Sequence, residues 1–113
     1  MKPLIYIAGP YASDPIGNTS KAIMVAEMIL VAGGTPLIPH LNHYWHEQVP
    51  HTREEWMEMD LNMLNHCDAM YRMSGESPGA DEEETFANNN HIPVFHSLSE
   101  VKKYCFDFDS VQW

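Results

Sequence analysis

Two carboxylates occupy positions where a folded domain would normally place apolar side chains. Residues 77–90 are expected to form a helix, and at about 100° per residue Glu83 falls at the centre of its apolar face. Residues 52–65 are expected to form another helix, in which Asp60 has apolar neighbours at i−4, i−3, i+3 and i+4. Each acid on its own could brace a loop or a helix end. Because an unpaired buried carboxylate costs several kcal/mol, two on adjacent helices predict a shared active site.

Paired carboxylates in different surroundings suit the cleavage of a glycosidic bond. One of them stays ionised and attacks or stabilises an oxocarbenium-like carbon, and the other keeps a proton for the leaving group. Asp60 would need a raised pKa for the second role, which its apolar neighbours would produce by desolvation.

The elements that must position these acids alternate between strands and helices. An apolar run predicts the first strand at residues 4–8, and a turn-rich loop follows at residues 9–17. The segment at residues 39–51 is expected to be a loop rich in histidine and aromatic residues. The tail at residues 104–113 alternates apolar and acidic residues, which predicts an edge strand or a dimer contact. Further strands are expected at residues 35–38, 69–72 and 92–95, and further helices at residues 19–32 and, as a short last helix, from residue 97.

This order predicts one α/β domain over residues 1–113, with a core at residues 4–103 and a tail at residues 104–113. We expect a flavodoxin-like three-layer sandwich with a four- or five-stranded parallel sheet. Such sheets bind ligands beyond the carboxyl ends of their strands, which directs attention to the loops at residues 9–17, 39–52 and 72–79.

The overall charge excludes some classes of partner. The formal net charge is −10 with only six Lys and Arg, so we expect no nucleic-acid partner. No apolar run approaches the roughly 20 residues that span a bilayer, and the apolar N-terminal run is too short for a signal peptide. We therefore expect no membrane partner and a cytoplasmic location.

Metal and cofactor motifs are weak. His40, His43 and His46 follow one another at three-residue spacing, which does not keep all three on one helical face, and Cys67 and Cys105 fit no metal or redox spacing. Glycine-rich nucleotide fingerprints are missing as well. We expect no metal and no organic cofactor.

Three aromatic residues near these histidines could stack on a base, although a core role is favoured for them: Tyr44, Trp45 and Trp56.

Several motifs carry a family resemblance. The run from Ile5 to Tyr11, Ile-Tyr-Ile-Ala-Gly-Pro-Tyr, resembles the opening strand and loop of the nucleoside 2-deoxyribosyltransferase superfamily. Asp60, Asp68 and the pattern Ser77-x-Gly79-x-x-x-Glu83-x-x-x-Ala87 resemble its second half. The spacing is most similar to the 2'-deoxynucleoside 5'-phosphate N-hydrolase branch and to short phage and bacterial relatives of the DUF4406 type. The resemblance spans about residues 4–95 and agrees with the α/β fold expected from the element order.

This resemblance implies roles for individual residues. Glu83 would be the nucleophile that attacks C1' of the sugar, Asp60 would assist departure of the base by proton transfer, and Tyr6 would orient Glu83 through a hydrogen bond. The ligand, a nucleotide or nucleoside, would be contacted by Gly9, Pro10, Tyr11, His40, Ser77 and Gly79.

Ser77 helps to choose the substrate. Related transferases carry an acidic residue there for the 5'-hydroxyl, whereas a serine at a helix N-terminus suits a 5'-phosphate. Its other role would be that of an N-cap. We therefore expect a hydrolase acting on a (deoxy)nucleoside 5'-monophosphate. The alternatives are a deoxyribosyltransferase acting on free nucleosides and a non-catalytic nucleotide-binding or sensing module.

The resemblance also implies a homodimer in which a neighbouring subunit completes the site, with Ser97 or Ser99 as the candidate residue.

Overall fold

The strands form one parallel sheet in the order β2-β1-β3-β4. The computed structural model describes the backbone of residues 1–111 and the side chains of residues 1–108. Tyr6 in β1 lies beside Leu37 in β2 and Met70 in β3. The predicted α/β fold with a parallel sheet is therefore confirmed. The strands are β1 (Leu4–Ala8), β2 (Thr35–Leu37), β3 (Ala69–Arg72) and β4 (Val94–Phe95).

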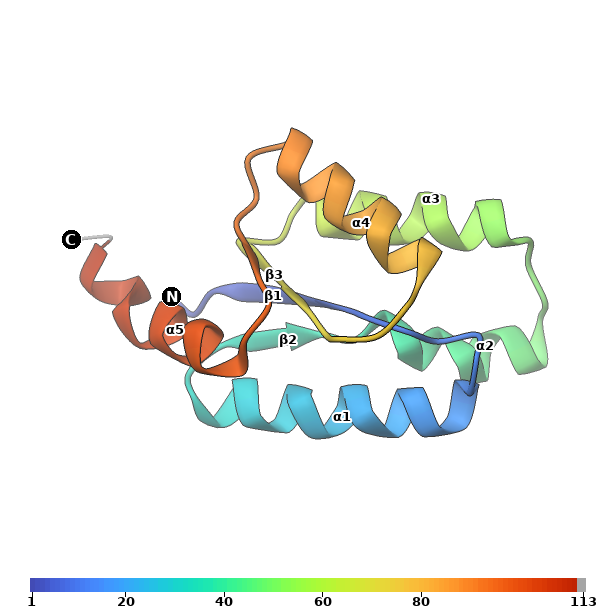
Figure 1. The fold of residues 1–113 in the computed structure, drawn as a ribbon, viewed down its shortest axis with the longest axis horizontal. Coiled ribbons are helices and arrows are strands. Elements are labelled where there is room, and N and C mark those ends of the chain that lie inside the picture. Colours follow the sequence, from blue (N-terminus) through green and yellow to red (C-terminus); the bar gives the residue numbers. More distant parts are fainter. Residues whose placement is uncertain (112–113) are drawn as a thin grey trace.

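Helices cover both faces of the sheet (Figure 1). Helices α1 (Pro15–Val31) and α5 (Leu98–Val111) lie on one face, and α3 (Arg53–Leu64) and α4 (Pro78–Asn89) lie on the other. No helix in the described part of the chain is long and apolar enough to cross a membrane.

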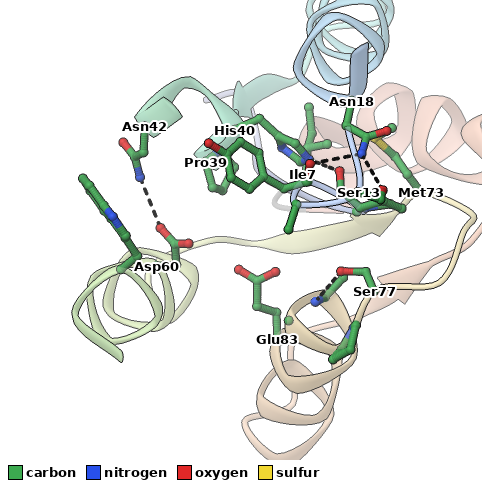
Figure 2. A pocket seen from close by; sticks show the side chains of 18 of the residues that line it. Ile7, Ser13, Asn18, Pro39, His40, Asn42, Asp60, Met73, Ser77 and Glu83 are labelled. Atoms are coloured by element: carbon green, nitrogen blue, oxygen red, sulfur yellow. Dashed lines mark hydrogen bonds between the residues drawn. The ribbon is translucent and has the colours of Figure 1, made fainter. Parts of the chain in front are cut away.

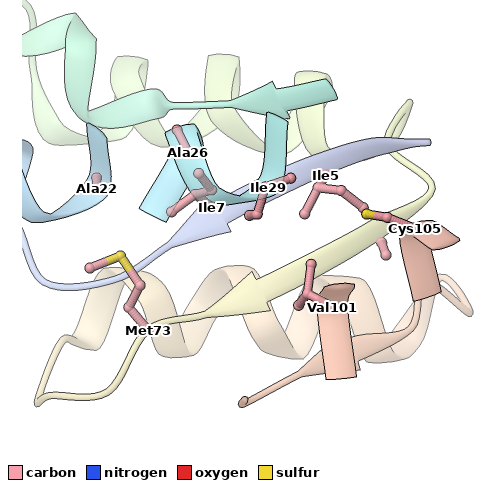
Figure 3. Close-up of a cluster of buried hydrophobic side chains, with 9 residues drawn as sticks. Ile5, Ile7, Ala22, Ala26, Ile29, Met73, Val101 and Cys105 are labelled. Atoms are coloured by element: carbon pink, nitrogen blue, oxygen red, sulfur yellow. The ribbon is translucent and has the colours of Figure 1, made fainter. Parts of the chain in front are cut away.

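Alternation along β1 divides the core into two layers. Ile5 and Ile7 pack with Ala26 and Ile29 of α1 on one face of the sheet (Figure 3). Tyr6, between them, points to the other face and packs beneath α3 and α4. The hydroxyl of Tyr6 is thereby carried to the helix that bears Glu83.

Most of the predicted elements are found close to their predicted bounds. Strand β3 has the predicted residues, and α4 begins at Pro78 with Ser77 as its N-cap. Helix α3 begins with the capping box expected at Thr52, whose hydroxyl accepts a hydrogen bond from the backbone of Glu55 at 3.1 Å. The start of α1 was predicted at Thr19 and is wrong, because Asp14 caps the helix through the N–H of Gly17 at 3.2 Å and Pro15 favours its first turn.

Two segments differ from the prediction in kind. Residues 39–51 are not one loop, because the short helices η1 (Pro39–Leu41) and α2 (Asn42–Gln48) occupy most of them. The prediction of an edge strand in the tail is also wrong, and so is the prediction of a short last helix, because α5 continues to Val111. Tyr104 packs against both Phe95 and Phe108, the latter one helical turn away, so the aromatic residues follow a helical period. The part of this prediction that concerns residues 112–113 lies outside the described residues.

Candidate active site

Helix α4 directs Glu83 inward. The hydroxyl of Ser77 accepts a hydrogen bond from the N–H of Ala80 at 3.1 Å, and Pro78 stands at the first helical position. Ala80 and Ala87 are buried against the sheet, and Glu83, on the same face between them, is only 7% exposed. The position on the helical wheel thus predicts the direction of this carboxylate.

Tyr6 holds the buried carboxylate from the sheet. Its side chain is fully buried in β1, and its hydroxyl donates a hydrogen bond to Oε2 of Glu83. Burial and the nearby charges of Glu83 and Asp60 raise the pKa of Tyr6 well above its usual value, so the phenol keeps its proton. Tyr6 therefore acts as a permanent donor that orients Glu83.

Asp60 faces the same space from the neighbouring helix. It lies half-buried on α3, and Oδ1 accepts a hydrogen bond from Nδ2 of Asn42 at 3.4 Å. Figure 2 shows the carboxyl groups of Asp60 and Glu83 pointing into one open cavity from α3 and α4. The two acids predicted to face inward are thus brought together.

The surroundings of the two acids differ in charge. Burial raises the pKa of Glu83 to about 7, and the hydrogen bond from Tyr6 opposes this rise. The negative charge of Asp60 contributes to this same rise, and the guanidinium of Arg72 opposes it. Burial alone raises the pKa of Asp60 to about 7. The Tyr6 hydroxyl and the Arg72 cation both favour the ionised form of Glu83, whereas Asp60 has only the longer hydrogen bond from Asn42, so Glu83 is the better carboxylate and Asp60 the better acid.

A cavity of about 1060 Å³ opens in front of these acids. It lies at the carboxyl ends of β1, β2 and β3, between residues 9–13, 39–46 and 73–80. Cavities of this size hold nucleotide-sized ligands, and this edge of a parallel sheet is where they bind. Every predicted ligand contact lines it, namely Gly9, Pro10, Tyr11, His40, Ser77 and Gly79.

The loops after β1 and β3 are packed tightly together. Gly75 has a φ of +117°, and a Cβ there would lie 2.8 Å from Cγ of Pro10. A Cβ at Gly9 would lie 2.9 Å from Cβ of Met73. Both positions therefore require glycine, for conformation and close approach at Gly75 and for close approach at Gly9.

Arg72 fixes the second of these loops and was not found from the sequence. It is the last residue of β3 and only 8% exposed. Its guanidinium donates hydrogen bonds to the carbonyl oxygen of Met73, to that of Gly75 at 3.1 Å, and to Oδ1 of Asp81 at 3.0 Å. A lone arginine in an otherwise apolar strand was the signal that could have revealed it.

His40 connects the loops after β1 and β2. It is 5% exposed, and its Nε2 lies 3.1 Å from the carbonyl oxygen of Pro10, to which it donates in the matching tautomer. Its Nδ1 is buried and has no partner among the described residues. Burial lowers the pKa of His40, so the ring is neutral at pH 7.

Helix α2 contributes residues that a loop prediction could not place. Asn42 contacts Asp60, His43 lies 2.6 Å from the hydroxyl of Tyr11, and His46 accepts a hydrogen bond from Nε1 of Trp56 at 2.9 Å. Asn42 and His46 share one helical face because they are four residues apart. These contacts were not predicted because the sequence analysis expects a loop, and not a helix, at residues 39–51.

The cavity is not lined by three other residues that the sequence analysis singled out, Ser97, Ser99 and Asp68. Ser97 and Ser99 hydrogen-bond to each other at 3.0 Å and do not line it, so their role in a neighbouring subunit stays a prediction. Asp68 accepts a hydrogen bond from the N–H of Leu4 at 2.8 Å and holds the start of β1. Within residues 1–108, no three His, Cys, Asp or Glu side chains are grouped to hold a metal ion.

The fold and this cavity define a class of protein, a parallel α/β domain with a ligand-sized cavity at the carboxyl edge of its sheet. The solved structure of the 2-deoxyribosyltransferase from the psychrotolerant bacterium Bacillus psychrosaccharolyticus is similar, with a TM-score of 0.61 and 20% sequence identity over 93% of this chain and 94% of that one. A family model described as a domain of unknown function (DUF7768) matches residues 3–97, and the chain belongs to this family. No curated protein matches the sequence. The expected N-hydrolase branch and DUF4406-like relatives are not confirmed, since the matching family is DUF7768.

Proposed function

We propose that this protein cleaves the N-glycosidic bond of a (deoxy)nucleoside 5'-monophosphate, with Glu83 as the nucleophile. The observation that carries the proposal is the pairing of Glu83, hydrogen-bonded to Tyr6, with Asp60 in one cavity. Their environments favour an ionised Glu83 and a protonated Asp60, which is the division of roles that retaining glycosidases need.

The first step forms a glycosyl-enzyme ester. A carboxylate oxygen of Glu83 attacks C1' of the sugar while the bond from C1' to the base nitrogen breaks. Asp60 gives its proton to the departing base, which leaves neutral. The hydroxyl of Tyr6 remains on the other oxygen of Glu83 and keeps the attacking oxygen directed at the sugar.

The second step releases the sugar phosphate. Asp60, now a carboxylate, takes a proton from a water molecule, whose oxygen attacks C1'. The ester bond breaks and Glu83 leaves as a carboxylate, so that both acids return to their starting states. The sugar keeps its original configuration at C1' because it is inverted twice.

The N-terminus of α4 is the proposed site for the 5'-phosphate. The N–H groups of this first turn and the hydroxyl of Ser77 suit an anion, and Ser77 lines the cavity while capping the helix. Asp81 in the same turn does not line the cavity and is ion-paired with Arg72 at 3.0 Å. Its charge is therefore offset by that of Arg72.

A transferase is the second candidate function. The likeness of the fold to a 2-deoxyribosyltransferase favours it. In that reaction a second base, in place of water, attacks C1' of the same ester with Glu83. The two activities thus share a first step and differ only in the acceptor.

The test is a panel of ribo- and deoxyribonucleoside 5'-monophosphates and free nucleosides, with released base measured by chromatography. We expect base release from one or more monophosphates and none with Glu83→Ala. Glu82→Ala is the matched control, because Glu82 is on the same helix but does not line the cavity. Addition of a foreign base separates the candidates, since only a transferase forms the mixed nucleoside.

A non-catalytic binding module would give a different result. Nucleotide would then bind the parent protein and Glu83→Ala with equal affinity, without turnover in either. This result would exclude the glycosidic mechanism.

We also propose that the protein forms a homodimer in solution, as the family resemblance implies. Light scattering coupled to size exclusion should give the mass of two chains. If Ser97 or Ser99 completes the partner's site, alanine at that position should reduce turnover while leaving the dimer intact. A monomer with full activity contradicts this proposal.

A further inference from the structure

Helices α2 and α3 face one another through two hydrogen bonds that are one turn apart. Nδ2 of Asn42 donates to Asp60 at 3.4 Å, and Nε1 of Trp56 donates to His46 at 2.9 Å. The two bonded residues are four positions apart on each helix. The residue number rises from one bond to the next on α2 and falls on α3, so the helices are antiparallel along this contact. His46 therefore lies one turn beyond the contact that holds the proposed leaving-group acid.

The hydrogen bonds of His46 fix the position of its ring proton. Two N–H groups converge on Nδ1, that of Nε1 in Trp56 at 2.9 Å and the backbone N–H of His51 at 3.2 Å. A nitrogen that accepts from two donors carries no hydrogen of its own, so the proton of the neutral ring is on Nε2. His46 is thus held in a single tautomer by its neighbours.

The Nε2–H group of His46 is free to reach a ligand. It has no hydrogen-bond partner among the described residues, and it is not one of the buried atoms that are sealed without a partner. The residue lines the cavity together with Trp56 and Met57, which supply apolar surface. This end of the cavity therefore combines a flat apolar wall with a fixed donor.

Asp60 provides a second donor at the same end. Its Oδ1 accepts the hydrogen bond from Asn42, so the proton of its acid form is carried by Oδ2. His46 and Asp60 thus each offer one donor at this lining of the cavity, and a base with acceptors beside α2 satisfies both of them.

We propose that His46 selects the nucleobase, favouring bases with a carbonyl oxygen over those with an amino group at the ring position farthest from the sugar. That position is C6 of a purine and C4 of a pyrimidine, and its substituent reaches farthest from the bond that Asp60 helps to break. A carbonyl oxygen there accepts a hydrogen bond from the Nε2–H group of His46. An amino group at the same place points its own N–H donors at that group, so no hydrogen bond forms. The inference rests on the proposed function for the identity of the ligand and adds the class of base.

The test measures binding, so that it does not depend on turnover. Dissociation constants of deoxyinosine and deoxyadenosine monophosphate, and of deoxyuridine and deoxycytidine monophosphate, are measured by calorimetry on the full chain carrying Glu83→Ala. We expect the oxo member of each pair to bind at least about tenfold more tightly. Equal affinity within the pairs, tighter binding of the amino members, or no binding of any of the four would overturn the inference.

Two substitutions of His46 isolate the donor. His46→Asn keeps an oxygen near the position of Nδ1 for Trp56 and loses the donor at the position of Nε2. The ratio of the dissociation constants of the amino and oxo members of each pair should then fall to about one. His46→Gln places an amide near Nε2 and should keep most of the preference. His66→Asn is the matched control, because His66 is exposed and outside the cavity. Thermal melting checks that each variant folds, and a ratio that His46→Asn leaves unchanged would count against the role of His46. The cleavage assay with Glu83 intact tests the proposed function separately.

Discussion

Two carboxyl groups in one cavity can divide the roles of nucleophile and acid only when their surroundings differ. Glu83 receives a hydrogen bond from Tyr6 and the field of the Arg72 guanidinium, while Asp60 receives one weak amide contact and, from the described residues, no cation. Burial raises both pKa values to about 7, so the difference in partners decides which acid ionises first.

A narrow pH dependence follows from these two acids. Turnover needs an ionised Glu83 and a protonated Asp60, so kcat/KM should fall on the acidic side as Glu83 gains a proton and on the alkaline side as Asp60 loses one. With both pKa values at about 7, we expect a bell with its maximum near pH 7. The measurement uses a free nucleoside, whose sugar carries no titrating phosphate, or the monophosphate if only that is cleaved. A flat profile between pH 5 and pH 9 would contradict the assignment.

The burial of Glu83 should also be visible in stability. Its pKa is raised from 4.5 to about 7 in the folded state, so the native protein holds this proton more strongly than the unfolded chain does. The associated stability is present below pH 4.5 and is lost as the pH rises to about 7. Glu83→Gln keeps an oxygen for Tyr6 and removes the charge, so it should raise the free energy of unfolding by about 1–3 kcal/mol at pH 8.

The same variant should have little effect at pH 4, where Glu83 is protonated in the folded protein and largely protonated in the unfolded chain. Urea unfolding at the two pH values makes the comparison, with Glu58→Gln as the control on an exposed position of α3. A loss of stability at pH 8 would show that the carboxylate is better stabilised in the fold than its burial implies.

At the scale of elements, the loop between β3 and α4, residues 73–77, depends on Gly75. Gly75→Ala adds a Cβ to a backbone with φ of +117° and places it 2.8 Å from Pro10, so we expect a loss of about 1–3 kcal/mol. Because this loop lines the cavity, ligand affinity should fall as well.

Gly33 provides the matched control for this substitution. Its φ is +101°, but a Cβ there has nothing within 4 Å, and it lies at the end of α1 away from the cavity. Gly33→Ala should therefore lower the melting temperature without changing ligand affinity. If the two variants lose affinity equally, the effect of Gly75 is one of global stability.

Local patterns predicted those elements whose ends carry chemical signals. The capping box at Thr52 and the Ser-Pro pair at Ser77 gave the starts of α3 and α4, and the helical period then directed Asp60 and Glu83 inward. Helix α2 was missed because its seven residues have no buried side chain and no side-chain cap, so neither period nor cap signals were present. Its contacts to α3 exist only in the folded chain.

At the scale of the whole molecule, a protein of charge −10 is proposed to bind an anion. The cavity itself is close to balanced, because Lys21 and Arg53 line it together with Glu76 and the two acids that share about one proton near pH 7. Repulsion of a monophosphate therefore comes from the charges outside the cavity. The radius of gyration is 13.6 Å, so these charges act on the ligand only when the Debye length is comparable or longer.

Salt should therefore increase the capture of a monophosphate. The Debye length is about 30 Å at 0.01 M salt and about 8 Å at 0.15 M, so raising the salt removes the long-range repulsion while the contacts inside the cavity persist. We expect kcat/KM for the monophosphate, or its association rate, to rise about two- to fivefold over this range. The corresponding uncharged nucleoside is the control and should show no change. A decrease with salt would mean instead that Lys21 and Arg53 attract the phosphate more strongly than the rest of the molecule repels it, and Lys21→Met should then weaken the salt dependence.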